Sequence, residues 1–216
     1  QDIKSKISEF SNPHPLKSIE SFIKDLPSNT TIGLDKIRAP FIFENICRER
    51  SLKFKYFEDP CIYPKAQKNE TELQGARLAN TRDGISITKF LYWLKNEIRI
   101  DDTDEIIAAE KLFTLRKNND LFYSLSFETI SATDQHSALP HYRVTKESNL
   151  RFKKNSIYLV DSGAQYLDGT TDITRTIILG SPTKEQKDRF TRVLKGHIAI
   201  ANCVFEEGAR GSLLDP

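Results

Sequence analysis

Two aspartates, Asp161 and Asp172, are the residues whose type and spacing could support catalysis. They lie eleven positions apart within the run DSGAQYLDGTTDITRT, residues 161–176. Asp161 follows the apolar run 157–160 and Asp172 precedes Ile173, so both occupy strand positions, where aspartate is disfavoured. Carboxylate oxygens suit Mn²⁺, Mg²⁺ or Zn²⁺, and a cation between two carboxylates removes their mutual repulsion. The pair is therefore a candidate metal site.

The register of the hairpin decides whether the two carboxylates meet. A two-residue turn at 168–169 would place Asp161 opposite Thr176 and separate the carboxylates. A connection centred on 166–167 would instead place Asp161 directly opposite Asp172, with Cβ atoms about 4.5–5.5 Å apart on one face. In that second register the pair could bind one ion, or bridge two ions about 3.5–4 Å apart. Both registers stay open, as does the alternative that the aspartates only serve turns.

Other patterns in the sequence point to no second kind of chemistry. It contains no Walker A, GxGxxG or GxSxG pattern. Its three cysteines form no CxxC pair, which argues against a thiolate zinc site or a disulfide framework and suits a reducing compartment. We assign no role to His14 or His136, and we expect His197, near Ile198 and Ile200, to pack structurally.

The run 161–176 closely resembles the metal-binding hairpin of the Xaa-Pro aminopeptidases, or aminopeptidase P, within the pita-bread metallopeptidases. Further similar segments follow in family order, and the match covers about residue 64 to the end of the chain. They are PKA at 64–66, KNE at 68–70, EL at 72–73, RDG at 82–84, LSFETIS at 125–131, LPHY at 139–142 and LKGH at 194–197.

The resemblance implies a role for each candidate residue. Asp161 would be a ligand of one metal ion, and Asp172 would bridge two divalent ions, usually Mn²⁺ in this family, with Zn²⁺ or Co²⁺ as alternatives. His141, at an expected strand start, matches the family's histidine that donates a hydrogen bond near the scissile bond. Without the resemblance, His141 would be an exposed histidine at the edge of a loop. The family's remaining ligands, a histidine and two glutamates, and its general-base glutamate lie further along its chain, so we expect them beyond Pro216.

The resemblance thus implies a metal-dependent aminopeptidase that hydrolyses the N-terminal Xaa-Pro bond with a water activated by two ions. Its substrates would be peptides with proline at the second position, and the complete enzyme would be a homodimer. Two alternatives stay open. One is a prolidase-like dipeptidase, which shares the hairpin aspartates, and the other is a non-catalytic pita-bread module that binds peptide or protein. Without the remaining ligands, we expect the 216 residues alone to be inactive.

Composition and charge exclude several classes of protein. The 32 lysines and arginines balance 30 aspartates and glutamates, so the net charge of +2 does not indicate a nucleic-acid partner. With 38% hydrophobic residues the chain can build a core, which excludes wholesale disorder. No apolar run approaches the roughly 20 residues of a membrane span, and the first residues lack the apolar region of a signal peptide. We expect a cytoplasmic protein without nucleic-acid or membrane partners.

The first block, residues 1–64, has the spacing of a small α/β unit. Its expected elements alternate, with helices at 16–23 and 41–47 and strands at 31–34 and 54–58. Residues 59–64 contain two prolines, so we expect irregular structure and a domain boundary there. The resemblance implies that this block is the C-terminal part of a non-catalytic domain, and the start at Gln1 without any methionine suggests a segment of a longer protein.

The second block, residues 65–216, indicates an α+β fold. Its expected elements are a long helix after the capping pair Asn69 and Glu72 that Gly84 could kink, a second helix capped by Asp102 and Glu105, strands at 124–133, 141–144, 156–166 and 170–179, and a last helix capped by Thr183 and Gln186. Helices segregated from antiparallel strands favour α+β over an alternating parallel sheet. The resemblance makes this block the N-terminal part of a pita-bread, creatinase/aminopeptidase-like, catalytic domain.

Overall fold

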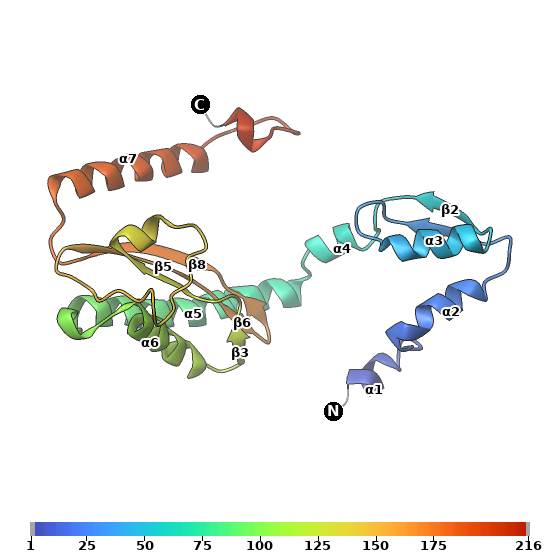
Figure 1. Ribbon diagram of the computed structural model, residues 1–216, viewed down its shortest axis with the longest axis horizontal. Coiled ribbons are helices and arrows are strands. Elements are labelled where there is room, and N and C mark those ends of the chain that lie inside the picture. Colours follow the sequence, from blue (N-terminus) through green and yellow to red (C-terminus); the bar gives the residue numbers. More distant parts are fainter. Residues whose placement is uncertain (1–2, 215–216) are drawn as a thin grey trace. The chain divides into compact units, whose positions relative to one another are not determined.

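The chain divides into two compact units between Lys68 and Asn69, whereas the sequence places the division after residue 64. The structure is a computed structural model that describes residues 3–214 (Figure 1). Within residues 59–64, where we expected irregular structure, helix α4 (Ile62–Ala66) begins. Pro64 lies in its first turn, where the missing N–H of proline breaks no intrahelical hydrogen bond. The prediction of irregular structure was therefore wrong for this part.

The first unit is a short parallel strand pair with helices. Its elements are α1 (Ile3–Ile7), the 3₁₀ turn η1 (Leu16–Ser18), α2 (Ile19–Lys24), β1 (Thr31–Leu34), α3 (Phe41–Glu49), β2 (Lys53–Tyr56) and α4. Strands β1 and β2 pair in parallel, and α3 makes the crossover between them. A small core forms where α2 and α3 meet the strands, and it contains Ile23, Ile46, Cys47 and Leu52.

Two helices form one layer of the second unit. Helix α5 (Glu70–Asn96) is continuous and starts at the predicted capping box, in which Glu72 N donates to Asn69 Oδ1 and Asn69 N donates to Glu72 Oε2. Helix α6 (Glu105–Lys117) starts after Asp104, whose Oδ1 accepts from Ile107 N at 2.8 Å. The predicted cap of Asp102 with Glu105 was therefore wrong, because Glu105 is instead the first residue of the helix and is fully buried.

Within residues 69–214, six antiparallel strands form the second layer in two small sheets. They are β3 (Phe122–Leu125), β4 (Ile130–Thr133), β5 (Ser156–Ser162), β6 (Ala164–Tyr166), β7 (Gly169–Thr170) and β8 (Ile173–Leu179). One sheet has the order β4-β5-β8 and the other has the order β3-β6-β7. Each of the three long strands expected at 124–133, 156–166 and 170–179 is thus shared between the two sheets. The segregation of helices from antiparallel strands confirms the predicted α+β class.

The main core lies between the two helices and one face of β5. Figure 1 shows both helices on one side of the strands. Side chains alternate along β5, so that Tyr158, Val160 and Ser162 are buried against the helices. Asp161 belongs to the opposite face of the strand. The central members of the core are Ile87, Phe90, Leu94, Ala108, Leu112, Phe152, Tyr158, Val160 and Leu179.

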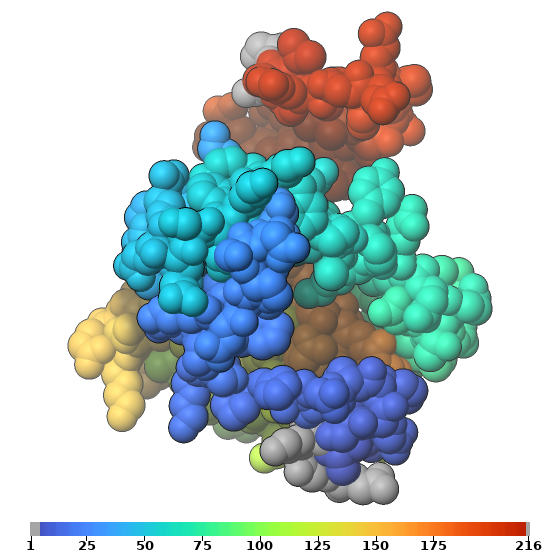
Figure 2. Space-filling view, turned by 90° about the vertical axis from the view of Figure 1, so that its right-hand side faces the viewer, coloured from blue at the N-terminus to red at the C-terminus, as the bar shows by residue number. Residues whose placement is uncertain are grey.

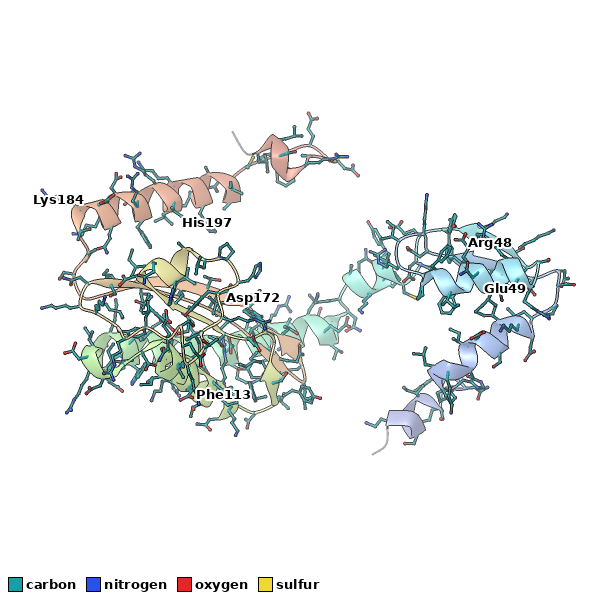
Figure 3. All side chains as sticks on the ribbon, in the orientation of Figure 1. Arg48, Glu49, Phe113, Asp172, Lys184 and His197 are labelled. Atoms are coloured by element: carbon teal, nitrogen blue, oxygen red, sulfur yellow. The ribbon has the colours of Figure 1, made fainter. Side chains whose placement is uncertain are left out.

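Helix α7 (Lys184–Ala201) follows the last strand and begins at the second predicted capping box, Thr183 with Gln186. It has no buried residue, and its apolar side chains are exposed. His197, labelled in Figure 3, is also exposed, so the expectation that it packs structurally was wrong. Within residues 3–214, no helix combines the length and the apolar character required to cross a membrane.

Candidate metal centre

The hairpin that carries both aspartates has a register that lies between the two registers left open by the sequence. Tyr166 pairs with Gly169, so the two-residue turn is 167–168. The same register continues into the other sheet, where Asp161 pairs with Thr174 and Ser162 pairs with Ile173. Neither predicted register occurs, because each is displaced from the observed one by two residues.

The observed register still brings the two carboxylates to one side of the hairpin. Asp172 lies two positions before Thr174, the partner of Asp161, so Asp161 and Asp172 are diagonal neighbours on the same face. Diagonal Cα atoms in an antiparallel pair lie about 7–8 Å apart, which leaves room for a cation between the side chains. Asp172 is labelled in Figure 3 beside the strands of the second unit.

Gly163 lets its strand approach Thr171 and Ser126 closely, at a point between the two aspartates. A Cβ atom built on it would lie 2.0 Å from Thr171 O and 2.3 Å from Ser126 Oγ, so a larger residue does not fit. These neighbours are tied together, because Ser126 N donates to Gly163 O and Ser126 Oγ donates to Thr171 O, each at 3.1 Å. Ser126 therefore links the backbone next to Asp161 with the backbone next to Asp172.

The surroundings of the two aspartates fit a cation. Asp161 is partly buried, and its Oδ1 is a buried oxygen without a hydrogen-bond partner, whereas Asp172 is exposed. A buried carboxylate oxygen without a partner is costly, and a divalent cation would satisfy it. Among the residues that the structure describes, no group of three or more histidines, cysteines, aspartates or glutamates could hold a metal ion. Two carboxylates would therefore make up only part of a ligand set.

His141 lies outside the strands, which corrects the expected strand at 141–144. The residue is exposed and has a φ of 57°, in the left-handed region, and residues 142–144 that follow it belong to no strand. Both edges of β5 are occupied, by β4 and β8, so this segment has no place beside the central strand. His141 is positioned instead by its neighbour Tyr142, which is 8% exposed.

Tyr142 belongs to a buried network around Glu105 that the sequence did not reveal. Glu105 is fully buried, and its carboxylate accepts hydrogen bonds from Thr133 N at 2.8 Å, Tyr142 Oη at 2.9 Å and Leu150 N at 3.1 Å. His136 Nδ1 lies 3.0 Å from Glu105 Oε1, and its ring stacks on Tyr142 at 4.4 Å. Burial raises the pKa of Tyr142. His136, which received no role above, is therefore a structural residue of the His141 loop.

A second buried network joins helices α5 and α6 to the hairpin. Arg116 donates to Asp83 from Nε at 2.8 Å and from Nη2 at 2.9 Å, and the two side chains are 0% and 3% exposed. Tyr166 Oη also donates to Asp83, at 2.9 Å. Burial, and then the neighbouring Asp83, raises the pKa of Tyr166 to about 12. Asp83 shares the face of Ala79 and Ile87, so its position within an apolar stripe is the sequence signal that could have identified it.

Comparisons with known proteins agree on one family. The sequence model of metallopeptidase family M24 matches residues 74–215. The probable Xaa-Pro aminopeptidase P of Aspergillus clavatus is 49% identical over 158 residues, which are 72% of this chain and 24% of that protein. The probable Xaa-Pro aminopeptidase P of Penicillium rubens is 47% identical over 158 residues, 72% of this chain and 26% of that protein. The chain thus spans about a quarter of the length of the curated relatives it matches.

Solved structures lead to the same family. The X-prolyl aminopeptidase of Caenorhabditis elegans, described as a cytosolic enzyme with a di-nuclear active site, superposes with a TM-score of 0.82 at 34% identity, over 99% of this chain and 36% of that chain. A prolidase from Thermococcus sibiricus, with a TM-score of 0.71 at 21% identity over 98% of this chain and 58% of that chain, shares the fold. The chain belongs to metallopeptidase family M24, and its α+β architecture is that of the family's pita-bread proteins.

Proposed function

We propose that these residues form part of an Xaa-Pro aminopeptidase that hydrolyses the N-terminal Xaa-Pro bond with the help of two divalent metal ions. The observation that carries this proposal is the placement of Asp161 and Asp172 on one face of a hairpin, with Asp161 Oδ1 buried and without a partner. The relatives named Xaa-Pro aminopeptidase P support the proposed specificity for proline at the second position.

Each candidate residue has a proposed part in the reaction. Asp161 would hold one ion and Asp172 would bridge both, and Mn²⁺ is the proposed metal. Bound ions of this kind lower the pKa of a water molecule and polarise the scissile carbonyl. His141 would donate a hydrogen bond to the substrate, from a loop that the buried Glu105 holds in place. The remaining ligands would come from parts of the relatives' length that this chain does not span.

The domain organisation and the setting are also part of the proposal. Residues 1–64 would be the C-terminal part of a non-catalytic domain, and residues 65–216 would be the N-terminal part of the catalytic domain. We propose that the complete enzyme is a cytoplasmic homodimer. The cytosolic X-prolyl aminopeptidase of Caenorhabditis elegans supports this compartment.

Metal binding and peptide cleavage by the complete polypeptide test the proposal. Loaded with Mn²⁺, it should release the first residue of peptides with proline at position two, and not of matched peptides with alanine there. Asp172→Asn should weaken Mn²⁺ binding and abolish cleavage. Asp188→Asn is the matched control, because the Asp188 side chain is 50% exposed on α7 and forms a surface ion pair with Arg192. Normal cleavage and metal affinity in Asp172→Asn would contradict the proposal.

A series of peptide lengths separates the alternatives. An aminopeptidase should cleave tripeptides and longer peptides, whereas a prolidase-like dipeptidase should cleave only Xaa-Pro dipeptides. A non-catalytic module should bind peptide and cleave none of them.

A further inference from the structure

The two halves of the hairpin could pair in several registers that bury the same side chains. A shift of the pairing by two residues keeps every side chain on its face, since side chains alternate with a period of two. Tyr158 and Val160 would therefore remain buried in either of the alternative registers considered from the sequence. Hydrophobic burial alone cannot select the register that sets the separation of Asp161 from Asp172.

We propose that Arg82 and Asp83, neighbours in helix α5, are positioning residues that select this register. The inference rests on the proposed function, because it gives these residues the task of placing two metal-binding carboxylates. Arg82 contacts the turn and Asp83 contacts the residue before the turn, and neither is among the proposed metal ligands.

Arg82 holds the turn. Its Nη1 donates to Asp168 Oδ1 and its Nη2 donates to Asp168 Oδ2, each at 3.0 Å. The side chains of Arg82 and Asp168 are 19% and 21% exposed, so water competes little for this pair. A two-point contact between guanidinium and carboxylate is directional. Because Asp168 is the second residue of the turn, the contact fixes which residues form it.

Asp83 and its partner Arg116 contact the chain on either side of Gly163. Asp83 accepts from Tyr166 Oη at 2.9 Å, and Tyr166 is the last residue before the turn. Its partner Arg116 also lies 3.4 Å from Ser162 O, through Nη2, and Ser162 follows Asp161 directly. The buried pair of Asp83 and Arg116 therefore contacts both ends of the segment 162–166.

The helix and the turn also meet through their backbones. A Cβ on Gly75 of α5 would lie 2.3 Å from Asp168 O, and a Cβ on Gly169 would lie 2.9 Å from Ala79 Cβ. Such close contacts leave no room for another pair of residues at the turn without a shift of the helix. The guanidinium of Arg82 also lies over the ring of Tyr166, 5.0 Å from its centre.

The test compares Arg82→Gln and Asp168→Asn with the wild type in the complete polypeptide. The first readout is the Mn²⁺ dissociation constant by titration calorimetry. Loss of a residue that orients metal ligands typically weakens metal binding by about 10–100-fold, and we expect a loss of at least about tenfold in each variant. The second readout is hydrogen exchange at Thr171 N, which donates to Ala164 O at 2.9 Å across the hairpin and should exchange faster.

Two controls separate positioning from a general loss of stability. Arg77→Gln removes an arginine of the same helix whose ion pair with Glu70 is exposed, and it should leave both readouts unchanged. Ile87→Val removes a methylene from the core on the same helix, and it should lower the melting temperature without a tenfold loss of Mn²⁺ affinity.

The outcomes distinguish this inference from the proposed function. Unchanged Thr171 exchange in Arg82→Gln would overturn the positioning role, whether or not metal binds. An affinity loss in Ile87→Val as large as in Arg82→Gln would also overturn it. If the wild type binds no Mn²⁺, the proposed metal site is wrong. If Thr171 still exchanges faster in Arg82→Gln, the role of Arg82 in the hairpin register is retained.

Discussion

At the scale of single residues, the protein places acidic side chains where their charge is compensated. Asp83 and Glu105 are buried, and each carboxylate accepts at least three hydrogen bonds. Burying a carboxylate without partners is costly, and these hydrogen bonds offset that cost. Asp161 is the contrast, since its buried Oδ1 has no such partner. This difference marks Asp161 as the carboxylate that fits a ligand.

The ion pair of Asp168 predicts a specific pH dependence of stability. The two hydrogen bonds from Arg82 lower the pKa of Asp168 below its ordinary value of 3.8. Because the pKa is lower in the folded state, the stabilisation is complete above the unfolded-state pKa and is lost as the pH falls through the folded-state pKa. The difference in unfolding free energy between the wild type and Asp168→Asn should therefore be constant above about pH 5 and shrink in more acidic solution.

Urea unfolding at a series of pH values measures this difference. Glu70→Gln is the control, because the Glu70 side chain is 82% exposed and its pair with Arg77 contributes little. A difference for Asp168→Asn that grows toward acidic pH would contradict the sign of the predicted effect.

At the scale of elements, helix α5 packs closely against the hairpin at one of its two glycines and not at the other. Gly75 lies against the turn, whereas a Cβ on Gly84 would meet nothing within 4 Å. The sequence suggested that Gly84 could kink the helix, but α5 runs continuously from Glu70 to Asn96. Gly75 is thus required by a close approach, and Gly84 is not.

Alanine at the two positions should change stability in opposite directions. Gly84→Ala should stabilise the protein by up to about 1 kcal/mol, because alanine favours the helix over glycine by about that amount. Gly75→Ala should destabilise it by about 1–3 kcal/mol despite the same propensity gain, because the new Cβ overlaps Asp168 O. Urea unfolding of both variants checks the signs, and stabilisation by Gly75→Ala would show that the turn can move away at little cost.

At the scale of the whole molecule, helix α7 exposes its apolar side chains. Its exposed apolar residues, with their exposed fractions, are Phe190 56%, Val193 74%, Leu194 44%, Ile198 49% and Ile200 62%. They recur at helical spacing, so they form one stripe. Figure 2 shows the side chains of the segment after α7, in red, at the surface as well. Exposed apolar patches of this kind promote association.

The 216-residue chain should therefore self-associate with increasing concentration. The variant Val193→Lys with Ile198→Lys should shift the sedimentation distribution toward the monomer. Ile37→Lys is the control, because Ile37 is 89% exposed and belongs to the first unit rather than to α7. A wild-type chain that sediments as a monomer at every concentration would contradict the prediction, as would an equal effect of the control.

Local signals in the sequence determined much of this protein. The capping boxes at Asn69 and Thr183 set the starts of two helices, since a cap needs only residues within one turn. The run 161–176 identified both candidate metal-binding aspartates, and the α+β class followed from the change of period between helices and strands. The family followed from the run 161–176 and the further motifs between residues 64 and 197, and the family model matches residues 74–215.

Only the tertiary structure decided how these parts meet. In the observed register Arg82 and Asp83 contact residues 166–168, more than 80 positions further along the chain, and the alternation of side chains determines the face of a strand but not its partner. Glu105 was expected to cap a helix. Its buried role could not be read from the sequence, because its hydrogen-bond partners come from distant segments. His141 was expected in a strand, which forms only where a sheet edge is free to pair. Each of these features depends on contacts between residues far apart in the chain, which local spacing cannot specify.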